Sequence, residues 1–124
     1  MIIPQRPLFL AFDWQGFSEK NYEKAITEGP LYEDTIYGII SVKHGENTYL
    51  VDIHYEKYEG EGKRFDLEVY KMNPDQSHGE WIGSIKEIRR ATDYAHFKRR
   101  AMKILSEFIP GYEIRNIYAN KETP

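Results

Sequence analysis

The sequence predicts a single α+β domain spanning residues 1–124, in which an antiparallel sheet of four or more strands carries a long amphipathic C-terminal helix on one face. Three observations predict it. The length of 124 residues is typical of one domain. Four strand-like runs follow one another with short turns between them, and strands joined by tight turns pair antiparallel. A stretch near the C-terminus has apolar residues at helical spacing. The predicted order is β-α-β-β-β-β-α-β.

The first two elements are a strand and a helix. "PLFLAFDW" is a short apolar run before a turn signal and predicts a buried strand. "SEKNYEKAITEGP" predicts a helix, with Ser18 as its N-cap and Gly29-Pro30 as its stop. Phe17 and Tyr22 flank the cap at the positions of a hydrophobic staple.

The four central strands are predicted at residues 35–43, 47–58, 64–72 and 81–88. Gly45-Glu46 suits a two-residue hairpin turn, and Gly60-Glu61-Gly62 suits a three-residue loop with a left-handed glycine. "NPDQSHGE" predicts a longer loop before the fourth strand. Ser84 and Glu87 also match a capping box, so a helical turn starting there is the alternative for that segment.

"TDYAHFKRRAMKILSEFIPG" is the clearest helix. One apolar stripe runs along it, consisting of Phe97, Ala101, Ile104, Leu105 and Phe108. Thr92 is the predicted N-cap, and Pro110-Gly111 is predicted to end the helix at about residue 108. "YEIRNIY" then alternates between apolar and polar residues, which predicts a final strand.

The register of the sheet follows from the turns, because the core residues of neighbouring strands must share a face. The first turn pairs Val42 with Tyr49, Ile40 with Val51 and Gly38 with Ile53. The second loop pairs Tyr55 with Leu67 and Ile53 with Val69, and a pairing of Leu67 with Ile85 is predicted beyond them. On the other face, the same register places Tyr37, His54, Glu68 and Lys86 in one row, with Ile39 beside Asp52 and Glu56 beside Asp66.

That other face gathers Asp52, His54, Glu56, Asp66 and Glu68. Carboxylates and an imidazole at this spacing can bind a divalent ion or transfer protons. A small metal- or His/Glu-dependent enzyme, using His54 and Glu68 with Tyr37 or Lys86, is therefore one hypothesis. The alternative is the polar, solvated face that antiparallel sheets normally have. Neither a metal nor a cofactor is indicated by any motif.

Apolar residues share this face with the charges. They are Tyr37, Ile39, Leu50, Tyr70, Met72, Ile82 and Ile88 in the predicted register. Contiguous apolar surface indicates either a cover from the chain's own terminal segments or a partner. The leading hypothesis is a small non-catalytic binding or accessory protein that meets a protein partner, or a second copy of itself, through Tyr37, Ile39, His54 and Tyr70.

The charge is unevenly spread along the chain. Residues 1–85 carry 8 basic and 15 acidic side chains, whereas residues 86–103 carry 7 and 2. A second function hypothesis is therefore contact with nucleic acid, which would use five cations, namely Arg89, Arg90, Arg99, Arg100 and Lys103. The alternative is a solvated helix face, and the sequence pI of about 5.8 argues against a dedicated nucleic-acid binder.

Several classes of protein are disfavoured. The chain contains no cysteine, which excludes disulfide scaffolds, thiolate zinc sites and cysteine nucleophiles. No phosphate loop, GxGxxG, HExxH or GxSxG motif occurs. No membrane span and no signal peptide are predicted, so a cytoplasmic protein is expected. We expect Asp13 to cap a turn and His44 and His78 to lie exposed in turns.

Overall fold

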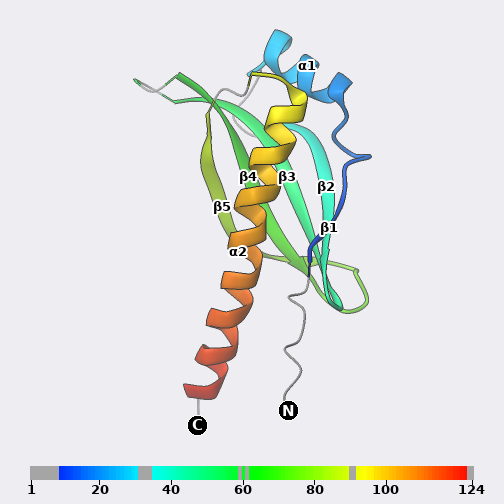
Figure 1. Cartoon of the computed structure of the whole chain (residues 1–124), viewed down its shortest axis with the longest axis vertical. Coiled ribbons are helices and arrows are strands. Elements are labelled where there is room, and N and C mark those ends of the chain that lie inside the picture. Colours follow the sequence, from blue (N-terminus) through cyan, green and yellow to red (C-terminus); the bar gives the residue numbers. More distant parts are fainter. Residues whose placement is uncertain (1–8, 31–34, 59, 61, 90–91, 123–124) are drawn as a thin grey trace, which may run out of the picture.

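The computed structural model describes residues 9–30, 35–58, 60, 62–89 and 92–122. Its elements are β1 (Ala11–Asp13), α1 (Glu19–Glu28), β2 (Ile36–His44), β3 (Asn47–Tyr58), β4 (Gly62–Met72), β5 (Gly79–Arg89) and α2 (Tyr94–Glu122). The five strands form one sheet in the order β1-β2-β3-β4-β5, with every neighbouring pair antiparallel. Figure 1 shows α2 lying across one face of the curved sheet, with α1 at one end. The predicted α+β class and the four central strands are confirmed.

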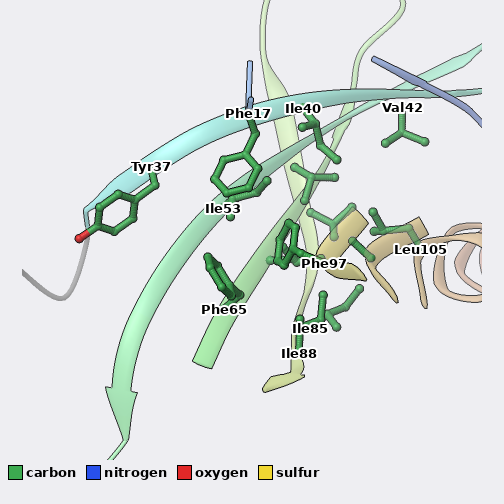
Figure 2. Close-up of a cluster of buried hydrophobic side chains, with 14 of the residues drawn as sticks. Phe17, Tyr37, Ile40, Val42, Ile53, Phe65, Ile85, Ile88, Phe97 and Leu105 are labelled. Carbon is green, nitrogen blue, oxygen red and sulfur yellow. The ribbon is translucent and has the colours of Figure 1, made fainter. Parts of the chain in front are cut away.

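The core lies between the sheet and the two helices. Phe65 of β4 packs on Phe97 of α2 with ring centroids 4.5 Å apart, and Tyr22 of α1 stacks on Phe65 at 5.6 Å. Phe17 joins this group from the segment before α1, 5.3 Å from Phe97 (Figure 2). Fully burying an aromatic side chain of this kind stabilises the fold by about 1.5–3 kcal/mol, so this cluster fixes both helices to the same face.

The start of α1 follows its sequence signals. Asn21 N donates to Ser18 Oγ and Ser18 N donates to Asn21 Oδ1 at 2.9 Å, which forms a capping box. Gly29 caps the other end, and its N donates to Ala25 O. The first strand differs from its prediction: β1 has three residues at the edge of the sheet, and Phe9 before it is exposed. Residues 7 and 8 of the predicted strand lie outside the described residues.

The β2–β3 register is as predicted, with Val42 opposite Tyr49 and Ile40 opposite Val51. The β3–β4 register differs by two residues, because Tyr58 pairs with Gly62 and the loop is centred on Gly60. Ile53 therefore faces Leu67 rather than Val69. A shift of two preserves the face of every side chain, so the predicted inward group stays inside.

Three bulges change the face of residues outside that group. Tyr37 is the extra residue of β2 between the pairs Ile36–His54 and Gly38–Ile53, and it is buried in the core. Figure 2 shows Tyr37 on the same side of the sheet as Phe17. Ile82 and Ile88 also pack in or against the core, because β5 bulges on both sides of the confirmed Leu67–Ile85 pair. The predicted placement of Tyr37, Ile82 and Ile88 on the other face is therefore wrong.

The segment at residues 81–88 is strand and not the alternative helical turn. One of its glycines has a packing role. Gly83 adopts φ +154°, and a Cβ there would lie 2.7 Å from the Phe108 ring of α2. The absence of a side chain at Gly83 thus lets α2 approach β5 closely.

Helix α2 is longer than predicted. The stripe of Phe97, Ala101 and Leu105 is buried as expected, and it continues through Ile109. Asp93 rather than Thr92 caps the first turn, since His96 N donates to Asp93 Oδ1 at 2.8 Å. Pro110 lies inside the helix, and the predicted final strand over "YEIRNIY" is wrong because these residues belong to α2.

Candidate functional site

The face of the sheet opposite α2, here called the open face, is built by alternate residues of β2 to β5. Across β3 and β4, Asp52 lies opposite Glu68, and His54 lies opposite Asp66. The remaining members are Ile36, Ile39, Ser41, Leu50, Glu56, Tyr70, Met72, Trp81, Ser84 and Lys86. The predicted His54–Glu68 row is thereby replaced by His54–Asp66, because the β3–β4 hairpin is shifted by two residues.

Two polar side chains of the open face are buried. Asp66 is 3% exposed and His54 is 9% exposed. Within the part of the chain that the structure describes, Asp66 Oδ1 and His54 Nδ1 have no hydrogen-bond partner. A buried polar atom without a partner costs about 1–3 kcal/mol. Such atoms are uncommon in folded proteins and mark a position that calls for a functional explanation.

The electrostatics of the open face are dominated by carboxylates. Burial, together with the charges of Glu68 and Glu56, raises the pKa of Asp66 to about 6 against the opposing effects of Lys86 and His54. Burial also raises the pKa of Asp52, which His54 partly offsets. The cations near Asp66 therefore do not compensate for burial and for its acidic neighbours.

Large apolar side chains surround these acids. Ile36 is 46% exposed, Ile39 is 43% exposed and Trp81 is 56% exposed. Trp81 is held at the edge of the acidic group, because its Nε1 donates to Glu68 Oε2 at 3.5 Å. Tyr70 is partly buried. Burial raises the pKa of its hydroxyl most, and the negative charges of Asp52 and Glu68 raise it as well.

The sequence-predicted binding residues are thus divided. Ile39, His54 and Tyr70 lie on the open face, and Tyr37 lies in the core. Trp81 was not among the predicted residues, since the bulge at Ile82 that brings it to this face is not visible in the alternation of the sequence.

The residues of the enzyme hypothesis are not gathered into one group. Tyr37 is buried on the other side of the sheet, and Glu68 lies opposite Asp52 and Ser84 rather than His54. Among the described residues, no three His, Asp or Glu side chains converge as ligands for a metal ion.

The basic segment is spread over different environments. Arg99 and Lys103 are exposed on α2, and Arg100 is partly buried. Lys98 lies over the Tyr94 ring, 4.7 Å from its centroid. Arg90 and the side chain of Arg89 lie outside what the structure describes. Of the five cations of the nucleic-acid hypothesis, Arg99 and Lys103 are thus exposed one helical turn apart in the described chain.

A second polar cluster joins α2 to the β2–β3 turn. Glu113 Oε1 accepts from Tyr49 Oη at 2.5 Å and from Asn47 Nδ2 at 2.8 Å, while Oε2 lies 2.6 Å from His44 Nδ1. Burial favours the protonated form of Glu113, but the hydrogen bonds from Tyr49, Asn47 and His44 outweigh it and lower its pKa. His44 is consequently buried and not exposed as predicted, whereas His78 is exposed.

Sequence reasoning missed this cluster because it assigned Glu113 to a strand. The signal that could have found it is the spacing of Glu113, which lies four positions after Ile109 and so on the same side of a continuous helix. The predicted role of Asp13 is confirmed, since Gln15 N donates to Asp13 Oδ1 at 3.0 Å.

One pocket of about 420 Å³ lies between the β2–β3 turn and the β4–β5 loop. Its lining mixes charges of both signs, including Glu46, Lys71 and Glu80, with the exposed His78. Neither Asp66 nor His54 belongs to its lining, so the open face is the better candidate site.

No protein-family model, no curated protein sequence and no solved structure matches this chain. In the described residues, neither α1 nor α2 is both long and apolar enough to cross a membrane.

Proposed function

We propose that this protein is a non-catalytic binding protein that receives another protein on the open face of its sheet. One observation carries the proposal: exposed Ile36, Ile39 and Trp81 share the open face with Asp66 and His54, which are buried and hold unpaired polar atoms. Burying apolar surface in a complex contributes roughly 25 cal/mol per Å². A partner with apolar and cationic groups would remove the apolar side chains from water and would also neutralise the acids.

The partner is a different protein rather than a second copy. A symmetric dimer through the open face would bring the Asp52, Asp66 and Glu68 group of one copy toward the same group of the other, and like charges in an interface cost several kcal/mol. The chain contains no cysteine and so needs no structural disulfide, and such disulfides are rare in cytosolic proteins. We therefore propose that the encounter takes place in the cytosol.

Site-specific photo-crosslinking tests the proposal. The photoreactive residue p-benzoylphenylalanine replaces Ile39 or Trp81 on the open face, and Ile26 on α1 is the matched control because it is also an exposed apolar side chain. Both open-face positions are expected to give an adduct with the same protein, and position 26 is not.

The adduct partner is then purified and titrated against the unlabelled chain. Ile39→Lys is expected to weaken binding about 10-fold or more, because it removes apolar contact at the centre of the interface, whereas Ile26→Lys leaves the affinity unchanged. Equal affinities for the two variants, or no adduct at either open-face position, would rule out this face as the binding surface.

A further inference from the structure

The open face contains a pair of carboxylates that face each other directly. Asp52 on β3 and Glu68 on β4 are cross-strand partners. Directly opposed side chains have Cβ atoms about 4.5–5.5 Å apart, and like charges at that separation destabilise the sheet. Tyr70, two residues beyond Glu68 on the same face of β4, lies beside this acidic pair.

A second observation at this place is independent of the acidic pair. Asp66 and His54 form the adjacent cross-strand pair, both are more than nine-tenths buried, and each has a polar atom without a hydrogen-bond partner in the described chain. Lys86 is exposed and acts on Asp66. The buried acid therefore lies beside Asp52 and Glu68 as a third carboxyl group of the open face.

The third feature is an aromatic surface. The indole of Trp81 is more than half exposed and is tethered to Glu68 through its Nε1. A planar cation can lie against an indole face while its edge reaches the carboxylate beside it. Arginine combines these properties, since its guanidinium is planar and carries five donors in a fixed fork.

We propose that the partner inserts an arginine side chain whose guanidinium bridges Asp52 and Glu68 and packs against the Trp81 ring. This inference rests on the proposed function and names the chemistry that the open face recognises: an arginine flanked by apolar residues. The flanking residues would cover Ile39 and Ile36, which lie next to Asp52 and His54 on β2.

The test uses a short synthetic peptide with one arginine between two valines, and the same peptide with citrulline, which has the shape of arginine without its charge. Each is titrated into the ¹⁵N-labelled full chain and followed by NMR. The arginine peptide is expected to shift the Trp81 indole and the backbone signals of Asp52 and Glu68, and to bind about 10-fold or more tightly than the citrulline peptide.

Charge-neutralising variants locate the effect. Asp52→Asn combined with Glu68→Gln is expected to abolish the preference for arginine over citrulline. The control is Glu46→Gln combined with Glu107→Gln, which makes the same change in net charge at two exposed positions outside the open face and should retain the preference. Urea unfolding of both double variants establishes that each is folded.

Equal binding of the arginine and citrulline peptides, or an unchanged preference in Asp52→Asn/Glu68→Gln, would overturn the inference. Adducts at positions 39 and 81 that persist in that event would leave the proposed function standing with a partner of other chemistry. Arginine binding without any adduct at those positions would instead support the cation site and remove the protein partner.

Discussion

Tyr49 of β3 donates a hydrogen bond to Glu113 of α2 across 2.5 Å, although the two residues are far apart in the sequence. The same carboxylate accepts from Asn47 and contacts His44. These contacts hold the second half of α2 onto the β2–β3 turn, and they lie beyond Ile109, the last fully buried residue among the described side chains of α2. The apolar stripe and the carboxylate together fix α2 along the sheet.

Glu113→Ala is expected to lower the free energy of unfolding by about 2–4 kcal/mol, because it leaves partly buried donors of Tyr49 and Asn47 without an acceptor. Urea denaturation at neutral pH measures the loss. Glu107→Ala on the same helix is the control, since Glu107 is exposed and its loss should change stability by less than about 0.5 kcal/mol. Similar effects of the two substitutions would contradict a structural role for the Glu113 contacts.

Asp66 makes the stability of the protein depend on pH in the opposite sense to an acid whose pKa is lowered by folding. Its pKa rises from 3.8 to about 6 on folding. Between these values the folded protein holds a proton that the unfolded chain has released, so the free energy of unfolding falls as the pH rises from 4 to 6. The full effect is roughly 3 kcal/mol or less, from 1.36 kcal/mol per pKa unit.

Comparing the wild type with Asp66→Asn isolates the contribution of Asp66 from that of Glu113. Folding lowers the pKa of Glu113, so its contribution to the free energy of unfolding is lost as the pH falls below the ordinary pKa of a glutamate. Chemical denaturation at pH 4 and at pH 7.5 is the measurement. As the pH is raised from 4 to 7.5, the free energy of unfolding of Asp66→Asn is expected to increase relative to that of the wild type. Parallel profiles of the two proteins would show that Asp66 titrates normally in the folded state.

Gly16 is required by a close approach of two backbones. Its carbonyl accepts from Ile39 N at 3.2 Å, and a Cβ at Gly16 would lie 1.8 Å from Ile39 O. Gly16→Ala must therefore displace the loop before α1 from β2, and we expect a loss of about 2 kcal/mol or more in urea unfolding. Gln15→Ala, at the exposed neighbouring position, should be close to neutral. A Gly16→Ala protein as stable as Gln15→Ala would mean that the loop does not lie against β2.

The inward side of the central sheet could be predicted because both hairpin turns of β3 place the same alternate residues of that strand on the inner face. Ile53 and Tyr55 had apolar partners under either register of the β3–β4 loop, so an error of two residues in that loop left their face unchanged. The open face was less predictable. A bulge adds one residue and reverses the alternation beyond it, and this moved Tyr37 into the core and brought Trp81 out.

The candidate site was predicted in part for the same reason. Asp52, His54, Asp66 and Glu68 were placed on one face correctly, since they lie on β3 and β4, whose mutual register contains no bulge. Their pairing was not, because it depended on which residue of the Gly60–Gly62 loop is central. The burial of Asp66 and His54 depends on the packing of neighbouring side chains, which a strand pattern does not contain.

The C-terminal helix shows local signals being overridden by tertiary contacts. Pro110 and Gly111 are strong helix terminators, and a proline inside a helix costs about 3 kcal/mol. Ile109 continues the buried stripe and Glu113 accepts from β3 and from the β2–β3 turn. These contacts are made only if the helix passes through the proline, and they offset its cost.

Gly111→Ala distinguishes a continuous helix from a helix that ends at this position. Gly111 is not among the described glycines with positive φ, and a Cβ there would come no closer than 3.8 Å to Arg115 Nη1. In a helix interior, alanine is more stable than glycine by about 0.5–1 kcal/mol, so the variant should unfold at a higher urea concentration and gain helical circular dichroism. A glycine in the left-handed conformation at the end of a helix would give the opposite result, because alanine is strained there. A loss of stability in Gly111→Ala would therefore restore the predicted break after residue 108 and would remove Glu113 from its place against Tyr49.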